Sequence, residues 1–192
     1  MNMRLPGHSA PTVGFEVPLE MLSACHGRVL HQCATLRRLV PHLVKHGADE
    51  NAGIAAAAVL RYFDTAAKDH HADEETDLFP ALIESMAGSD AVCIRELVHA
   101  LTVDHRALES HWARLRVVLL QLAAGTALPL ADEEVEAFVA LYEQHIAREE
   151  SELLPMAARL LDDEALDRVG KAMRERRGIT AVAQGPATAR GA

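Results

Sequence analysis

Apolar residues recur along the chain at the three- and four-residue spacing of amphipathic helices. Three segments rich in Gly, Pro, Asp and Asn interrupt this spacing, at 46–53, 86–90 and 123–132. The pattern therefore predicts four long helices and one short one, over about 19–45, 52–85, 90–123, 132–161 and 163–176. Long helices with short connections are typical of neighbours that run antiparallel. We expect an all-α fold, an up-down-up-down antiparallel four-helix bundle followed by a short fifth helix.

The same pattern divides the chain into four regions. Residues 1–18 hold three prolines and are expected to form an extended arm before the bundle of residues 19–162. The C-terminal helix occupies 163–177, and a glycine that can terminate it, Gly178, follows. Residues 178–192 are small, polar and rich in helix breakers, so we expect a disordered tail.

Composition supports a helical domain and argues against several classes of protein. Of the 192 residues, 49% are hydrophobic and 4% aromatic, which provides a core but few of the residues favoured in strands. The formal charge of −9 without a basic stripe argues against nucleic acid as a partner. No apolar run reaches the ~20 residues of a membrane span or forms a secretory signal, so we expect no membrane contact and a cytoplasmic location. The three cysteines form no C-x-x-C motif and are expected to be reduced thiols.

The second and fourth predicted helices carry the same polar residues inside their apolar stripes. Shifted by 75 residues without a gap, His70 falls on His145 and Glu74 on Glu149, within the common frame EE-x-x-L-[FL]-P. In both helices the histidine and the first glutamate occupy positions where the apolar periodicity predicts a core residue. These four side chains are therefore expected to point into the bundle.

A second His-x-x-x-Glu pair, His71 and Glu75, overlaps the first on the second predicted helix. The two pairs are rotated by about 100° from each other, so both cannot face the same core. His71 and Glu75 lie in line with Asp64 and Lys68, which predicts a solvated face. We interpret His71, Glu75 and Glu150 as outer residues that surround the site, with entry of one of them into the site as the alternative.

The first and third predicted helices supply two further histidines at stripe positions. An overlay with an offset of 79 residues places His26 on His105. His26 lies 22 residues before the first connection, near residue 48, and His70 lies 22 residues after it, about 33 Å along each helix. Counting from the other connections brings six residues to one level, within one or two turns: His26, His70, Glu74, His105, His145 and Glu149.

Six such groups in a helical core point to metal binding. Buried carboxylates without partners are costly, and neutral imidazoles and carboxylates around divalent or trivalent cations satisfy all six groups at once. Glutamates can bridge two metal ions while histidines fill terminal positions, as in the carboxylate di-iron bundles. Nitrogen and oxygen ligands without thiolate favour iron or manganese over a structural zinc ion. A lone buried histidine is usually a packed core residue, but two pairs repeated in register argue against that interpretation.

Three further residues border this site. Pro80 and Pro155, each six residues after its glutamate, are expected to kink or end the helix and to aim the apolar pair before them as a lid. Glu109 shares a helix face with His105, as a seventh ligand or, in the interpretation we prefer, as part of a salt bridge at the edge of the core.

Four segments resemble the hemerythrin-like, HHE cation-binding family, in the correct order over about residues 19–160: CHGRVL, HHADEETDLFP, DHRALESHW and HIAREESELLP. The resemblance implies a bundle that holds two iron ions, joined by an oxo or hydroxo bridge. Carried over residue by residue, it implies the six ligands named above, with Glu74 and Glu149 bridging the irons. Oxygen-carrying hemerythrins have a further histidine four residues after the third-helix ligand, where this chain has Glu109. The family's iron-centre repair proteins add an N-terminal cysteine-bearing domain, in place of which this sequence has a short arm.

The expected function is that of a small di-iron protein that binds or senses oxygen, nitric oxide or peroxide at an open iron position. The first alternative is an enzyme with the same ligands: a peroxidase, a nitric-oxide reductase, an iron oxidase or an iron-centre repair protein. Such an enzyme needs a proton donor, for which Glu75, Glu109 and Glu150 qualify, but the sequence indicates no dedicated substrate pocket, so we rank binding above catalysis. The second alternative is a bundle that serves protein interaction alone, through the fifth helix and tail. The sequence identifies no protein partner.

Overall fold

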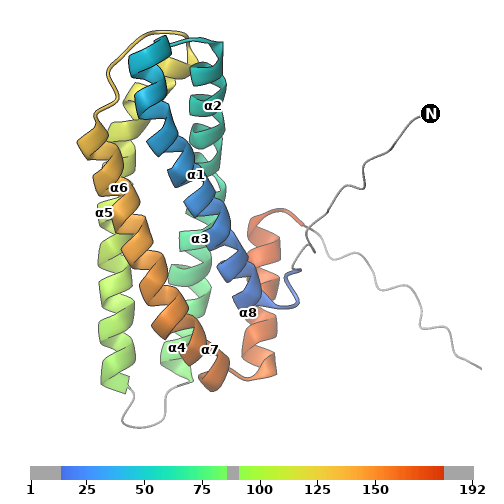
Figure 1. Cartoon of the computed structure of the whole chain (residues 1–192). Coiled ribbons are helices and arrows are strands. Elements are labelled where there is room, and N and C mark those ends of the chain that lie inside the picture. Colours follow the sequence, from blue (N-terminus) through green and yellow to red (C-terminus); the bar gives the residue numbers. More distant parts are fainter. Residues whose placement is uncertain (1–13, 86–90, 180–192) are drawn as a thin grey trace, which may run out of the picture.

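The computed structural model describes residues 14–85 and 91–179, and within these ranges every regular element is a helix (Figure 1). In chain order the elements are α1 (Pro18–His46), α2 (Glu50–Asp64), α3 (Ala66–Asp73), the π-helical turn η1 (Glu74–Leu78), α4 (Phe79–Glu84), α5 (Ala91–Ala123), α6 (Asp132–Arg148), the π-helical turn η2 (Glu149–Leu153), α7 (Leu154–Leu160) and α8 (Asp163–Arg176). The predicted all-helical fold is confirmed for this part of the chain. Residues 1–13 of the predicted arm and 180–192 of the predicted tail lie outside the described residues.

Short polar residues and a glycine set the helix ends around the first connection. α1 stops at Gly47, whose φ of 71° is a conformation that a residue with a Cβ rarely adopts. Asp49 then caps α2, because its carboxylate accepts a hydrogen bond from the amide of Ala52 at 2.8 Å. Asp162 caps α8 in the same way. Gly47 and Asp49 therefore fix where the chain turns back between α1 and α2.

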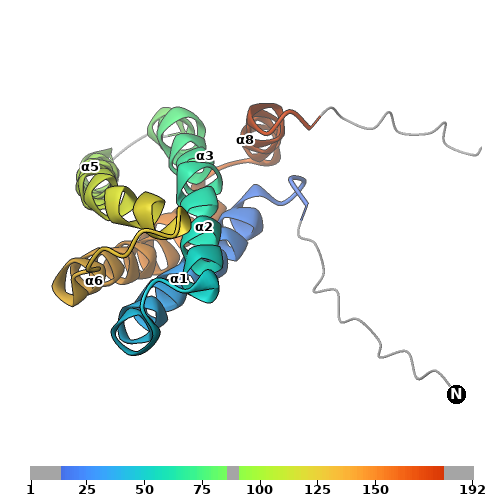
Figure 2. The same ribbon diagram turned by 90° about the horizontal axis from the view of Figure 1, so that it is seen from above.

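Four helical lines enclose a common core. α1 packs against α2 and α6, and α5 packs against the same two helices (Figure 1). α3 and α4 continue the line of α2, and α7 continues the line of α6. Figure 2 shows α8 outside this group, on the side of α1 and α3, which it contacts. Among the helices of the described ranges, none combines the length and the hydropathy that a membrane span requires.

The predicted second helix is divided into shorter pieces. α2 ends at Asp64, and Thr65 has φ −127° and ψ −84°, outside the helical region. The hydroxyl of Thr65 donates a hydrogen bond to the carbonyl oxygen of Arg61 at 2.6 Å. α3 starts again at Ala66. The break changes the rotation of α3 relative to α2, so one continuous helical face does not run through both helices.

A π-helical turn begins at each of the two glutamates that the 75-residue repeat pairs, Glu74 and Glu149. In the first turn the amide of Phe79 donates to the carbonyl of Glu74, five residues earlier, and Pro80, which has no amide hydrogen, follows. The second turn repeats this arrangement before Pro155. The sequence predicts that the prolines kink or end their helices; instead, each is the second residue of a helix that continues the line, α4 or α7. Such π turns are frequent at functional sites.

A polar layer divides the buried core into two apolar clusters. The first cluster includes the aromatic side chains Phe63 and Phe138 and lies toward the connection between α1 and α2. The second lies around α4, α7 and α8. On α5, for example, Leu108 belongs to the first cluster and Leu101 to the second, and His105 lies between them. The same order recurs on the other three helical lines, so the layer is sealed by apolar side chains on both sides.

Candidate metal centre

The six side chains that the repeat pattern selects lie together in this polar layer and are buried. Their exposed fractions are 3% for His26, 2% for His70, 1% for His145, and 0% for Glu74, His105 and Glu149. Every one of the four helical lines contributes at least one of them. Burying this many polar groups is unfavourable unless they have partners.

Glu74, the first residue of η1, lies between two histidines and offers a different oxygen to each. Its Oε1 is 3.5 Å from Nε2 of His70, which is one helical turn earlier. Its Oε2 is 3.3 Å from Nε2 of His105 on α5. One carboxylate therefore faces imidazoles from two helical lines.

Glu149, the first residue of η2, has the matching arrangement. Its Oε1 is 3.0 Å from Nε2 of His145, and its Oε2 is 3.0 Å from Nε2 of His26 on α1. The two glutamates thereby complete two groups of four ligand atoms, each atom within 4.8 Å of the others in its group: His26, His70, Glu74 and Glu149, and Glu74, His105, His145 and Glu149. Both carboxylates belong to both groups, so two cations held by these groups would share them.

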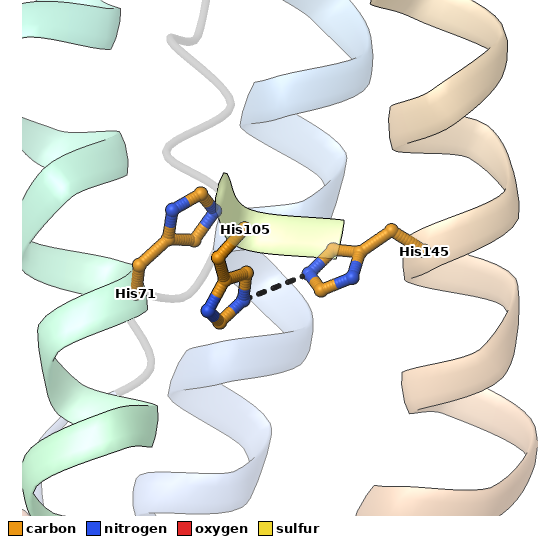
Figure 3. Close-up of side chains that lie close together, drawn as sticks. All are labelled: His71, His105 and His145. Atoms are coloured by element: carbon orange, nitrogen blue, oxygen red, sulfur yellow. Dashed lines mark hydrogen bonds between the residues drawn. The ribbon is translucent and has the colours of Figure 1, made fainter. Parts of the chain in front are cut away.

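Nε2 of His105 and Nε2 of His145 lie 3.1 Å apart, within hydrogen-bonding distance (Figure 3), but the contacts of the glutamate oxygens with the imidazoles are not hydrogen bonds. Among the described residues, both oxygens of Glu74 and of Glu149, and Nε2 of His26, have no hydrogen-bond partner. Two ligand atoms that each lie about 2.1 Å from one metal ion are about 3 to 3.5 Å apart. The observed nitrogen-to-oxygen distances of 3.0 to 3.5 Å have this size. The residues therefore fit two cations, whose binding would satisfy the unpartnered atoms.

Without a cation the two carboxylates are in an unfavourable position. Burial, together with the nearby charge of Glu149, raises the pKa of Glu74 well above its ordinary value. Burial also opposes ionisation of Glu149, but the imidazoles of His145 and His26 outweigh it and hold the pKa of that carboxyl well below its ordinary value. The metal-free pair is thus arranged to carry one negative charge and one proton, and two cations would remove the repulsion that favours this state.

Three of the buried histidines are held neutral, the form in which imidazole binds metals. Burial lowers the pKa of His70 to about 3. Burial and the proximity of His145 lower the pKa of His105. Burial and the proximity of His105 lower the pKa of His71 well below its ordinary value. A lone pair is therefore available on each ring at neutral pH.

The second glutamate of each Glu-Glu pair holds a histidine from the outside. Glu75 Oε1 lies 2.7 Å from Nδ1 of His105, and Glu150 Oε1 lies 2.5 Å from Nδ1 of His26. A carboxylate on Nδ1 places the proton there and leaves the Nε2 lone pair directed at the centre. Glu75 and Glu150 are therefore outside the two groups of four, where the sequence pattern places them. The pattern gave no sign of Asp104, which lies 3.6 Å from Nδ1 of His145.

The prediction that His71 lies on a solvated face is wrong. Its side chain is 9% exposed, and its ring stacks on that of His105 with 4.0 Å between centroids and 14° between planes (Figure 3). His71, His105 and His145 form a third group whose nitrogens lie within 4.8 Å of one another. The solvated face was inferred from one continuous helix through Asp64, and the break at Thr65 removes that continuity.

Two other residues near the site, Glu109 and Phe79, differ in their exposure. Glu109 is 54% exposed and forms an ion pair with Arg106 at 2.5 Å, which is the salt bridge we prefer over a seventh ligand. Phe79, from the apolar pair before Pro80, is buried with its ring nearly parallel to that of His105, 6.2 Å between centroids. The apolar residues after the glutamates thus close the layer on the side of α4 and α7.

A helical bundle with a buried layer of histidines and shared carboxylates defines a class of cation-binding domains. The sequence model of the hemerythrin HHE cation-binding domain family matches residues 17–157. The chain is also 35% identical over 162 residues to a protein of Haemophilus influenzae described as uncharacterized, covering 84% of this chain and 91% of the relative. The chain belongs to the hemerythrin HHE cation-binding domain family. The matched range contains all six buried residues of the layer, so this is a metal-binding domain of that family.

Proposed function

We propose that this protein holds two iron ions in an up-down-up-down hemerythrin-like bundle and binds or senses a small ligand, oxygen, nitric oxide or peroxide, at the iron pair. The observation that carries the proposal is the double sharing of Glu74 and Glu149. Each carboxylate offers one oxygen to the group of His26 and His70 and the other to the group of His105 and His145. Two bridging carboxylates require two cations side by side.

The choice of iron follows from the donor set. Six nitrogen- or oxygen-bearing side chains without a thiolate favour iron or manganese. Cys25 is buried on α1, directly before His26, but belongs to none of the three ligand groups. When bound, the iron pair supplies redox change and a coordination position for the small ligand. The three cysteines are free thiols, which suits the reducing cytoplasm that we propose as the location.

The chain's own residues orient the imidazoles and keep water out. Glu75 accepts a hydrogen bond from Nδ1 of His105 and forms an ion pair with the guanidinium of Arg106. Asp104, beside His145, is held by Arg148 at 2.7 Å. These charged pairs lie at the edge of the layer, while the two apolar clusters cover its faces. Fixed imidazoles in a dry layer keep the ligand atoms in place before any ion arrives.

An enzyme that uses the same iron pair is the second candidate. The observation that favours it is a cavity of about 380 Å³ that reaches from the surface to His71 and is large enough for more than a diatomic ligand. A peroxidase, a nitric-oxide reductase, an iron oxidase or an iron-centre repair protein would each need such an approach. Turnover of peroxide or nitric oxide by the iron-loaded protein would favour this candidate over a sensor.

Metal content and an optical spectrum of the purified protein test the proposal. We expect about two irons per chain and the charge-transfer bands of an oxo or hydroxo bridge. His145→Ala removes a ligand and should abolish most iron loading, whereas His31→Ala, an exposed histidine on α1, should leave it unchanged. A colourless wild-type protein that takes up no iron contradicts the proposal.

A further inference from the structure

A cavity of about 380 Å³ lies between α2 and α3 on one side and α5 and α6 on the other. Its walls are buried apolar and aromatic side chains, among them Phe63, Leu108, Trp112 and Tyr142, together with the imidazole of His71. Exposed charged side chains line its outer part: Lys68, Arg106 and Glu109. The cavity is therefore apolar inside and charged at its opening.

His71 lies between this cavity and two of the candidate ligands. Its ring covers one face of the His105 ring, 4.0 Å between centroids, and lies 5.9 Å from the ring of His145. Figure 3 shows the three imidazoles converging from α3, α5 and α6. His71 also borders the cavity, whereas His105 and His145 are not among the residues that line it. A molecule that moves from the cavity toward these two histidines meets His71 first.

The imidazole of His71 has an unused hydrogen-bonding atom. The His71 side chain is 9% exposed. Its Nε2 is buried and has no hydrogen-bond partner among the described residues. A buried ring nitrogen without a partner is unfavourable unless another group occupies the space it faces. The carboxylate oxygens of Glu74 and Glu149 and Nε2 of His26, which are also unpartnered, are accounted for by the two proposed cations, and Nδ1 of His70 and Nδ1 of His145 belong to proposed metal ligands. His71 is in neither of the two groups of four, so its nitrogen is left for a different partner.

We propose that His71 is the ligand-binding residue of this site: it closes the inner end of the cavity and donates a hydrogen bond from Nε2 to a small ligand held beside His105 and His145. This inference rests on the proposed function and adds to it the route of access and the side of the metal pair that the ligand occupies. The ring is held in place by stacking on His105 and by Tyr142, whose ring lies 6.1 Å away at 29°.

The surroundings of His71 define the chemical class of the ligand. The inner walls of the cavity offer aromatic and aliphatic surface, and His71 is the polar group at their end. Such a space favours a small ligand of low hydration that has one atom able to accept a hydrogen bond. Nitric oxide, oxygen and the azide ion meet this description. A carboxylate or phosphate ester is bulkier and more strongly hydrated than azide, so its transfer between these apolar walls would cost more.

Azide binding to the iron-loaded full-length protein tests the inference, with His71→Leu, His71→Gln and His31→Leu as variants. Iron content measured beside each optical titration separates a loss of metal from a loss of ligand affinity. We expect about two irons per chain in every variant. His71→Leu should weaken azide binding about tenfold or more because it removes the donor. His71→Gln should restore much of the affinity through its amide, and His31→Leu should match the wild type.

Three results would overturn the inference. The first is equal azide affinity in the wild type and His71→Leu. The second is a loss of about one iron per chain in both His71 variants, which would make His71 a metal ligand. The third is an iron-loaded wild type that binds neither azide nor nitric oxide. A wild type that takes up no iron overturns the proposed function itself, and this inference with it, so the two failures are distinguishable.

Discussion

Glu150 accepts a hydrogen bond from Nδ1 of His26, with 2.5 Å between oxygen and nitrogen, although the two residues are 124 positions apart in sequence. Glu75 makes the equivalent contact to His105 at 2.7 Å. In each Glu-Glu pair the first carboxylate faces the centre, and the second reaches a histidine on another helical line. The doubled glutamates of the repeat therefore have two different structural roles, one inside the layer and one at its edge.

Removing an outer glutamate should weaken metal binding without abolishing it. Glu150→Ala leaves the ring of His26 free to rotate and to carry its proton on either nitrogen, and the loss of such a partner typically costs about 10- to 100-fold in metal affinity. Competition with a chromogenic chelator measures the effect. Glu152→Ala, an exposed glutamate on the same π turn, is the matched control and should change little. Equal affinities for Glu150→Ala and Glu152→Ala would contradict this role.

The C-terminal helix should stabilise the segment that presents Glu74. Asp73, directly before it, is 0% exposed and is paired with Arg176 and with Arg177 from the end of α8, the latter at 2.6 Å. Replacing both arginines by alanine leaves a buried carboxylate unpaired, which should lower the free energy of unfolding by about 3 kcal/mol. Urea denaturation of the chelator-treated protein measures the loss.

Two further variants test whether the charge of Asp73 is the cause. Adding Asp73→Asn to the double arginine variant removes the buried charge and should recover part of the lost stability. Arg168→Ala disrupts a pair in which both side chains are mostly exposed, 60% and 85%, and should cost less than about 0.5 kcal/mol. An Arg176/Arg177 variant as stable as Arg168→Ala would show that α8 does not secure this segment.

A charged contact between α2 and α5 should make stability depend on pH. The carboxylate of Asp64 accepts a hydrogen bond from the indole nitrogen of Trp112 at 3.0 Å and another from Nε of Arg116 at 2.9 Å. Burial opposes its ionisation, but these donors outweigh it, so the pKa of Asp64 is lowered from its ordinary value. Because the folded pKa is the lower one, the contact stabilises the fold above the unfolded pKa of about 3.9 and is lost as pH falls through the folded value.

Asp64→Asn measures this contribution. In chelator-treated protein the variant should be less stable than the wild type by about 1.5 kcal/mol at neutral pH, the lower end of the range for a hydrogen bond to a charged group. The difference should shrink as the pH falls through the lowered pKa of Asp64, because the wild-type carboxyl is then protonated too. A difference of the same size at both pH values would mean that the charge of Asp64 contributes nothing.

The repeat pattern predicted which side chains form the buried polar layer because two independent periodicities agree at the same residues. His70, Glu74, His145 and Glu149 interrupt an apolar stripe and also match each other 75 residues apart. Two residues that lie equally far from the connection between two antiparallel helices are at the same level of the bundle. Counting residues from the connections therefore also placed His26 and His105 at the level of the other four. Neither argument requires knowledge of side-chain positions, and both still hold if the predicted helix ends are wrong by a few residues.

The position of His71 and the cavity beside it were not predictable in the same way. Periodicity assumes a constant rotation per residue, whereas Thr65 breaks the helix before His71 and a π turn follows it at Glu74. The cavity is lined by residues of α2, α3, η1, α5 and α6, including Phe63, Trp112 and Tyr142. Its shape depends on how these helices pack, which no single segment of the sequence records.

The central claim is that Glu74 and Glu149 together bridge two iron ions. Iron K-edge X-ray absorption of the purified protein, with iron and protein quantified on the same sample, tests it most directly. The account predicts about two irons per chain and an iron-to-iron scattering distance of about 3.5 to 4 Å, the spacing of paired metal ions in two-metal sites. One iron per chain with no iron-to-iron contribution would contradict it.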